Sequence, residues 1–122
     1  MENLSTTPKN CIEKVIMFDP VIYNMQAELC HSMSQPARLQ ILHALFEGAK
    51  NVGEIANATG LGQSMVSRHL AILKNNGIVT STRNGQEIFY RVANPKIIEV
   101  CNLMRMVLLE QITERSNLIS QE

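Results

Sequence analysis

Hydrophobic residues recur at helical spacing in the first third of the chain. After Pro20, four of them lie four positions apart and form one apolar stripe of a helix: Val21, Met25, Leu29 and Met33. The segment Ser34-Gln35-Pro36 predicts a break, because proline suits the first turn of a new helix. A second helix then runs to Gly48 with a broad apolar face of Leu39, Ile41, Leu42, Leu45 and Phe46.

Two further helices are separated by a turn that contains two glycines. The pattern predicts a short helix near 52–58, a turn over 59–62 and a helix over 63–75. We expect Val52, Ile55 and Ala56 of the short helix to face the core, together with Val66, Leu70 and Leu73 of the longer helix.

After residue 77 the hydrophobic residues recur at every second position, which is the spacing of a β-strand. Residues 78–83 and 86–92 read as strands around Asn84-Gly85, a strong signal for a β-hairpin. Helical spacing returns after Pro95 and continues to about residue 119. We therefore predict a mainly α-helical fold with a small β-hairpin, in which an N-terminal arm (1–19) precedes one domain (20–119).

Composition excludes several classes of protein. The chain has 122 residues, of which 45% are hydrophobic and 18% are charged, so it suits one packed domain and is too apolar for a disordered chain. No apolar run reaches the roughly 18 residues of a membrane span, and the polar residues 1–10 do not resemble a secretion signal. Three cysteines without a CxxC pair do not make a disulfide framework. We expect a cytoplasmic protein.

The net charge is zero, but basic residues gather in the middle of the chain. Residues 36–91 contain six basic and three acidic side chains, a net charge of +3, whereas both ends are slightly acidic. This excess is either a chance fluctuation or the mark of a segment that meets a polyanion.

The order of short helix, turn, helix and hairpin is that of a winged helix-turn-helix, which binds DNA. The second helix of the motif keeps one face free of apolar residues. Its short or forked polar side chains fit a major groove about 12 Å wide: Gln63, Ser64, Ser67, Arg68 and His69. For His69, packing or a phosphate contact is preferred to metal ligation. At the hairpin tip, the side chains placed to reach the DNA backbone or minor groove are Arg83, Asn84 and Gln86.

Four segments resemble the ArsR/SmtB family of small bacterial repressors. They are ELCHSMSQPARLQIL at 28–42, VGEIA at 52–56, QSMVSRHL at 63–70 and GQEIFYR at 85–91. The resemblance extends over residues 20–112. It implies a homodimeric winged-helix repressor that leaves double-stranded operator DNA after ligand binding or oxidation.

Two common metal sites of that family can be compared with this chain. One uses Cys-x-Cys-Asp at the start of the helix-turn-helix, where this chain has Asn51-Val52-Gly53-Glu54. The other uses Asp and His at the start of the last helix and His and Glu about three turns later, where this chain has Asn94, Lys96, Val107 and Glu110. Because Lys and Val do not hold Zn²⁺, we expect neither metal site and no cofactor.

The cysteines are the remaining candidates for sensing. Cys30 lies near the end of the first long helix and Cys101 in the second turn of the last, two helices that pair at the dimer interface of the family. Cys11 in the arm is a third candidate. Three interpretations stay open. The thiols form a disulfide or polysulfide, with Arg105 favouring the Cys101 thiolate; three thiolates bind a soft ion such as As(III); or the cysteines are structural. The inducer is unknown.

Apolar residues cover more than one face of the last helix. They are Ile97, Ile98, Val100, Leu103, Met104, Met106, Val107, Leu108, Leu109 and Ile112. A helix this apolar in a small domain must bury a second face, which predicts a homodimer through the first and last helices. Two recognition helices about 34–36 Å apart would then read an inverted repeat.

No catalytic pattern stands out in the sequence. A Ser/His/Asp set, a glycine-rich phosphate loop and paired carboxylates are all missing, so we expect a regulator and not an enzyme. A winged helix that binds only proteins is the other alternative, and it would lack salt-dependent affinity for DNA.

Overall fold

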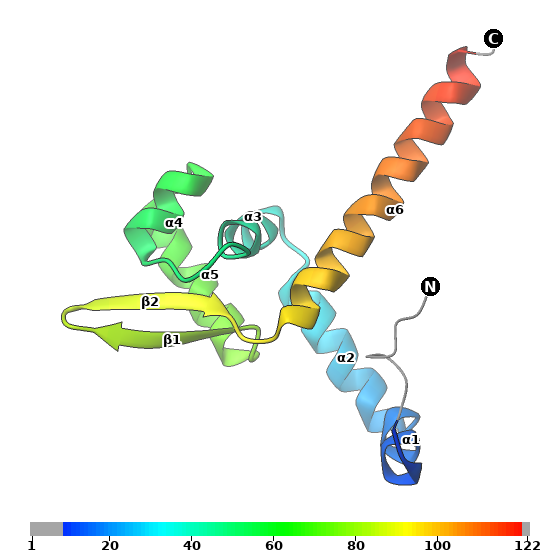
Figure 1. The fold of residues 1–122 in the computed structure, drawn as a ribbon, viewed down its shortest axis with the longest axis horizontal. Coiled ribbons are helices and arrows are strands. Elements are labelled where there is room, and N and C mark those ends of the chain that lie inside the picture. Colours follow the sequence, from blue (N-terminus) through cyan, green and yellow to red (C-terminus); the bar gives the residue numbers. More distant parts are fainter. Residues whose placement is uncertain (1–8, 121–122) are drawn as a thin grey trace.

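The structure is a computed structural model that describes residues 9–120 (Figure 1). The elements follow the order α1 (Cys11–Met17), α2 (Pro20–Ser32), α3 (Pro36–Ala44), α4 (Val52–Thr59), α5 (Gln63–Asn75), β1 (Val79–Asn84), β2 (Glu87–Val92) and α6 (Pro95–Ser120). This order confirms the predicted helical fold with one hairpin. Among the described residues, no helix is both long and apolar enough to cross a membrane.

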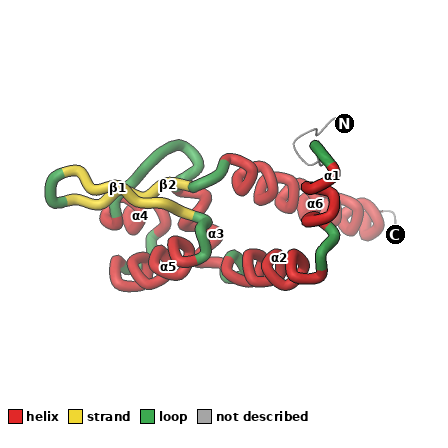
Figure 2. The backbone as a smooth tube through the Cα atoms, turned by 90° about the horizontal axis from the view of Figure 1, so that it is seen from below, coloured by secondary structure: helices red, strands yellow, loops and turns green. Residues whose placement is uncertain are grey.

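The protein divides lengthwise into a body and a set of projecting helices. The body consists of α3, α4, α5 and the hairpin, whereas α2 and α6 leave it in different directions (Figure 1). Figure 2 shows the same division from below, with α1, α2 and α6 all on one side of the body.

Fully buried residues come from every element of the body except β2. The residue that precedes β1 is also fully buried. Nine hydrophobic side chains, each at most 2% exposed, form the core: Ile41, Leu42, Leu45, Ile55, Val66, Leu70, Leu73, Ile78 and Val79. Burying such a side chain contributes about 1.5–3 kcal/mol each. Leu29, Met33 and Ile97 are partly buried against this core, and they attach the end of α2 and the start of α6 to the body.

The ends of α2 and α3 agree only in part with the sequence pattern. Pro20 and Pro36 occupy the first turns of α2 and α3, as predicted. However, α3 ends at Ala44 and not at Gly48. Beyond Ala44 the backbone tightens, because the amide of Phe46 bonds the carbonyl of His43 at 3.1 Å and the amide of Gly48 bonds that of Leu45 at 3.2 Å.

The hairpin forms the wing of the fold. Its antiparallel register runs from Val79 opposite Val92 to Asn84 opposite Glu87. The two-residue loop is therefore Gly85-Gln86, one residue later than the predicted Asn84-Gly85. Gly85 has a φ of +68°, which is the requirement for the first loop position of a type II′ turn.

Helix α1 was not predicted from the hydrophobic pattern. The Asn10 side chain accepts a hydrogen bond from the Glu13 amide at 2.8 Å and so caps the helix. All residues of α1 are exposed in the single chain. The helix therefore arises from local capping, which an analysis based on apolar spacing does not detect.

Candidate nucleic-acid interface

The two helices of the helix-turn-helix are held apart by a glycine turn. Gly60 ends α4 in the left-handed region with a φ of 77°, and its amide bonds the Ala56 carbonyl at 2.8 Å. The Thr59 hydroxyl accepts from the Leu61 amide at 3.2 Å, and Gly62 then starts α5. The sequence therefore fixes where the second helix begins.

One face of α5 is buried and the other is exposed. Val66, Leu70 and Leu73 are fully buried and pack α5 onto the core. The opposite face is exposed and carries four of the predicted DNA-contacting side chains: Gln63, Ser64, Ser67 and Arg68. An exposed helix face with forked or short polar side chains is suited to base edges and phosphates in a major groove.

His69 differs from these four residues. It is half-buried, and its Nδ1 accepts a hydrogen bond from Nε of Arg38 at 3.1 Å. Burial first, and then the positive charges of Arg38 and Arg68, hold the pKa of His69 below its usual value of 6.5. The structure therefore favours a neutral imidazole whose Nε2 is the atom left for a further partner.

Arg38 was given no role in the sequence analysis. It is 8% exposed, and its Nη1 also donates to the Ser32 carbonyl at 3.1 Å, so it joins α2, α3 and α5. A signal was present: Arg38 lies three, four and seven residues before Ile41, Leu42 and Leu45, on the apolar face of its helix.

The wing lies against the helix-turn-helix. β1 contacts α5 and β2 contacts α4. Lys50 and Tyr90 exchange two backbone hydrogen bonds of 3.0 and 2.8 Å, which attach the segment before α4 to β2. The predicted wing residues Arg83, Asn84 and Gln86 are all exposed.

Asn51 connects α4 to the wing. Its Oδ1 accepts from the Glu54 amide at 2.8 Å and the Glu54 carboxylate accepts from the Asn51 amide at 3.0 Å, which is a capping box. Its Nδ2 donates to Oε1 of Glu87 at 2.9 Å. The segment that would carry thiols in a metal-sensing relative thus serves here as a helix cap.

The three cysteines lie on three helices as free thiols. Cys11 on α1 and Cys30 on α2 are exposed, and Cys101 on α6 is half-buried. Burial raises the pKa of the Cys101 thiol and outweighs the opposing charge of Arg105. Arg105 favours the Cys101 thiolate, as expected, but burial has the larger effect and the net shift of the pKa is upward. Within residues 9–120 of one chain, no three His, Cys, Asp or Glu side chains are grouped to hold a metal ion.

Comparisons with known proteins place this geometry in a family. The sequence pattern of the family described as "Bacterial regulatory protein, arsR family" matches residues 35–81. The HTH-type transcriptional regulator Rv0081 of Mycobacterium tuberculosis is 34% identical over 95 residues, which cover 77% of this chain and 83% of that protein. The chain belongs to the arsR family. It is a DNA-binding transcriptional regulator of this family and not an enzyme, as predicted.

A second relative and the solved structure of Rv0081 support the same assignment. The biofilm growth-associated repressor of Xylella fastidiosa is 35% identical over 88 residues, which cover 72% of this chain and 77% of that protein. The crystal structure of M. tuberculosis Rv0081 aligns with a TM-score of 0.71 over 80% of this chain and 97% of that chain.

A winged helix-turn-helix domain of Mycobacterium bovis, described as homodimeric, aligns with a TM-score of 0.71 at 30% identity. The alignment covers 77% of this chain and 87% of that chain. These likenesses confirm the predicted winged helix-turn-helix fold.

Proposed function

We propose that the chain is a homodimeric repressor that binds an inverted-repeat operator in the cytoplasm. The observation that carries this proposal is the exposed polar face of α5, formed by Gln63, Ser64, Ser67 and Arg68. In this arrangement α5 enters the major groove, and the exposed wing tip (Arg83, Asn84 and Gln86) reaches the backbone or minor groove. His69 supports α5 through Arg38 and offers Nε2 to a phosphate.

The projecting helices supply the proposed dimer interface. On α6, residues such as Leu103, Met104 and Leu108 are 46%, 67% and 54% exposed, and on α2 Val21 and Met25 are 59% and 58% exposed. Contiguous apolar surface of this kind marks an interaction site. A two-fold partner would cover it and would place two α5 helices on adjacent turns of DNA. The homodimeric relative from M. bovis supports this assembly.

Removal of Arg68 tests the DNA-binding surface. Arg68→Ala should weaken operator affinity roughly 10- to 100-fold, because a guanidinium contact to guanine or phosphate contributes about 1–3 kcal/mol. Fluorescence anisotropy against labelled operator DNA at several salt concentrations measures this loss. The charge-matched control, Lys14→Ala on α1, should bind as the wild type does. Equal affinity of Arg68→Ala and wild type would contradict the proposed role, and an affinity without salt dependence would favour a protein-binding winged helix.

We further infer that release from DNA uses the thiols of Cys30 and Cys101, which lie on the two helices of the proposed interface. Exposed Cys30 would be oxidised first, to a sulfenic acid, and the Cys101 thiol would then displace water to form a disulfide. Two thiols lose two electrons and two protons, and one hydrogen peroxide takes them up to give two water molecules. Cys11, also exposed, is a possible third participant. As(III) is the alternative inducer, and a three-thiolate site would draw on cysteines of both chains, since residues 9–120 of one chain bring no three such ligands together.

Substitution of Cys30 tests this mechanism. Cys30→Ser should keep operator affinity and lose the response to hydrogen peroxide, because no disulfide can form. Anisotropy gives the affinity, and mass spectrometry of the intact protein gives the loss of two hydrogen atoms per disulfide. Cys11→Ser tests the third thiol: an unchanged response to peroxide would limit the mechanism to Cys30 and Cys101, and a lost response would include Cys11. A Cys30→Ser protein that still leaves the operator with peroxide would contradict the thiol mechanism, and a response to As(III) alone would favour the metalloid.

A further inference from the structure

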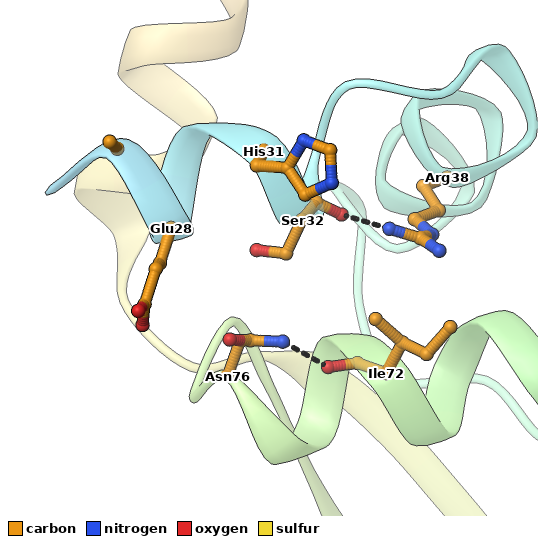
Figure 3. A pocket seen from close by; sticks show the side chains of 7 residues that line it. Glu28, His31, Ser32, Arg38, Ile72 and Asn76 are labelled. Carbon is orange, nitrogen blue, oxygen red and sulfur yellow. Dashed lines mark hydrogen bonds between the residues drawn. The ribbon is translucent and has the colours of Figure 1, made fainter. Parts of the chain in front are cut away.

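A hollow lies between α2 and α5, and on α5 it is lined by Ile72 and Asn76. It has a volume of about 520 Å³, within the range of small-molecule sites. Figure 3 shows six of its lining residues: Glu28, His31, Ser32, Arg38, Ile72 and Asn76. Nothing in the proposed DNA contacts uses this hollow.

Arg38 forms one end of the hollow, and no carboxylate of the described residues pairs with it. Its side chain is buried, at 8% exposure, and its hydrogen-bond partners among residues 9–120 are the uncharged His69 ring and the Ser32 carbonyl. A guanidinium has five N–H donors, and these two bonds occupy two of them. A buried cation without a carboxylate is costly, so an incoming anion that pairs with it gains more than it would at a surface arginine.

Glu28 forms the other end. Figure 3 shows Glu28 and Arg38 reaching the hollow from opposite sides, with Ser32 and Asn76 between them. Glu28 is exposed, and the oxygens of a carboxylate accept hydrogen bonds. An anion alone would therefore meet repulsion at this end. A ligand with an anionic and a cationic group would satisfy both ends.

We propose that this hollow is an effector site for a small amino-carboxylate, such as a free amino acid. Its carboxylate pairs with Arg38 and its ammonium group with Glu28, while Ile72 and Ala27 supply apolar contact for the carbon atoms. Binding to the free protein requires only these residues. The consequence for DNA rests on the proposed function.

The same arginine connects the hollow to the recognition helix. Nε of Arg38 holds Nδ1 of His69, the residue next to Arg68 on α5. A carboxylate that turns the guanidinium toward the hollow alters this bond and thereby the seating of α5. By thermodynamic reciprocity, a ligand that lowers DNA affinity binds the DNA-bound protein more weakly by the same factor.

Calorimetric titration of the full chain without DNA tests the site. The probes are the twenty common amino acids, each compared with the carboxylic acid that lacks the amine and the amine that lacks the carboxylate. We expect at least one amino acid to bind with a Kd on the order of 1 mM or tighter, and its two truncated forms to bind roughly tenfold more weakly or not at all. If no amino acid binds at about 10 mM, the proposal is wrong.

Three variants locate the binding. Glu28→Gln, at an exposed position, should fold and weaken the amino acid roughly tenfold. Ala27→Phe should block the hollow and leaves the hydrogen bonds of the buried Arg38 in place. The control Glu47→Gln removes an exposed carboxylate outside the hollow and should bind as the wild type does. Unchanged binding by both Glu28→Gln and Ala27→Phe would overturn the site. Operator affinity measured without ligand tests the proposed function separately, so either proposal can fail alone.

Discussion

The hydrogen bond between Arg38 and His69 makes the seating of the recognition helix depend on the charge of one imidazole. The bond needs an unprotonated Nδ1, because Arg38 Nε is the donor. A proton on Nδ1 would remove the acceptor and would place a second positive charge beside the guanidinium. Acid should therefore loosen the contact between α3 and α5.

The pH dependence of stability tests this contact. Because the folded pKa of His69 is lowered from 6.5, the unfolded chain takes up the proton first. The stabilisation is thus fully present above pH 6.5 and is lost as the pH falls through the lower folded pKa. His69→Gln should remove this part of the pH dependence, since glutamine does not titrate. Urea unfolding between about pH 7.5 and about pH 5 measures this pH dependence. The control His43→Gln, away from Arg38, should retain the wild-type profile.

For single residues, the sequence predicts whether a side chain is exposed better than it predicts which other residue that side chain contacts. Apolar spacing correctly left Gln63, Ser64 and Arg68 on the exposed face of α5, because period 3.6 alone decides which side is buried. Their contacts with DNA remain a prediction. The partner of His69 lies 31 positions earlier in the chain, and no local pattern reports such a contact.

Among the elements, α4 and the wing depend on one side chain. Asn51 caps α4 and also donates to Glu87 at the start of β2. This bond and the Lys50–Tyr90 pair therefore add to the packing of β1 on α5 in positioning the wing relative to the helix-turn-helix.

Two substitutions separate these contributions. Asn51→Ala should lower the free energy of unfolding by about 1 kcal/mol, because it removes the cap and the bond to the wing. Glu87→Ala leaves the capping box intact and removes a single exposed hydrogen bond, so it should cost less than half as much. Urea denaturation of both variants gives the difference. If the two losses were equal, the cap would contribute nothing.

The order of elements was predictable, whereas their ends were less so. The hairpin followed from Asn84-Gly85, yet pairing of Asn84 with Glu87 moved its loop by one residue. Helix α3 stopped before Gly48 because a tight turn satisfies its last carbonyls, and the glycine signal does not resolve this local hydrogen bonding. Helix α1 depends on the Asn10 cap and not on apolar spacing.

For the whole molecule, the main feature is the amount of apolar surface left on the projecting helices. α6 has 26 residues, a length of about 39 Å, and most of its hydrophobic side chains are exposed in one chain. This surface is the reason to expect assembly, and it was predictable because the apolar residues cover more than one face.

A charge on α6 should prevent this assembly. Leu108→Asp buries a carboxylate in the proposed interface, so the protein should sediment as a monomer at micromolar concentration and bind operator DNA at least tenfold more weakly, as one half-site does. The control Gln111→Asp adds the same charge at a polar position and should remain dimeric. Sedimentation equilibrium distinguishes the two. A wild-type protein that sediments as a monomer would contradict the interface itself.

The fully buried core lies between residues 41 and 79, a short stretch of the chain. Contacts that are close in sequence form quickly, since little loop entropy is lost before they are made. The body should therefore fold first, in a step whose rate is independent of protein concentration. Helices α2 and α6 acquire their remaining contacts only when two such bodies meet, and this second step should accelerate with concentration.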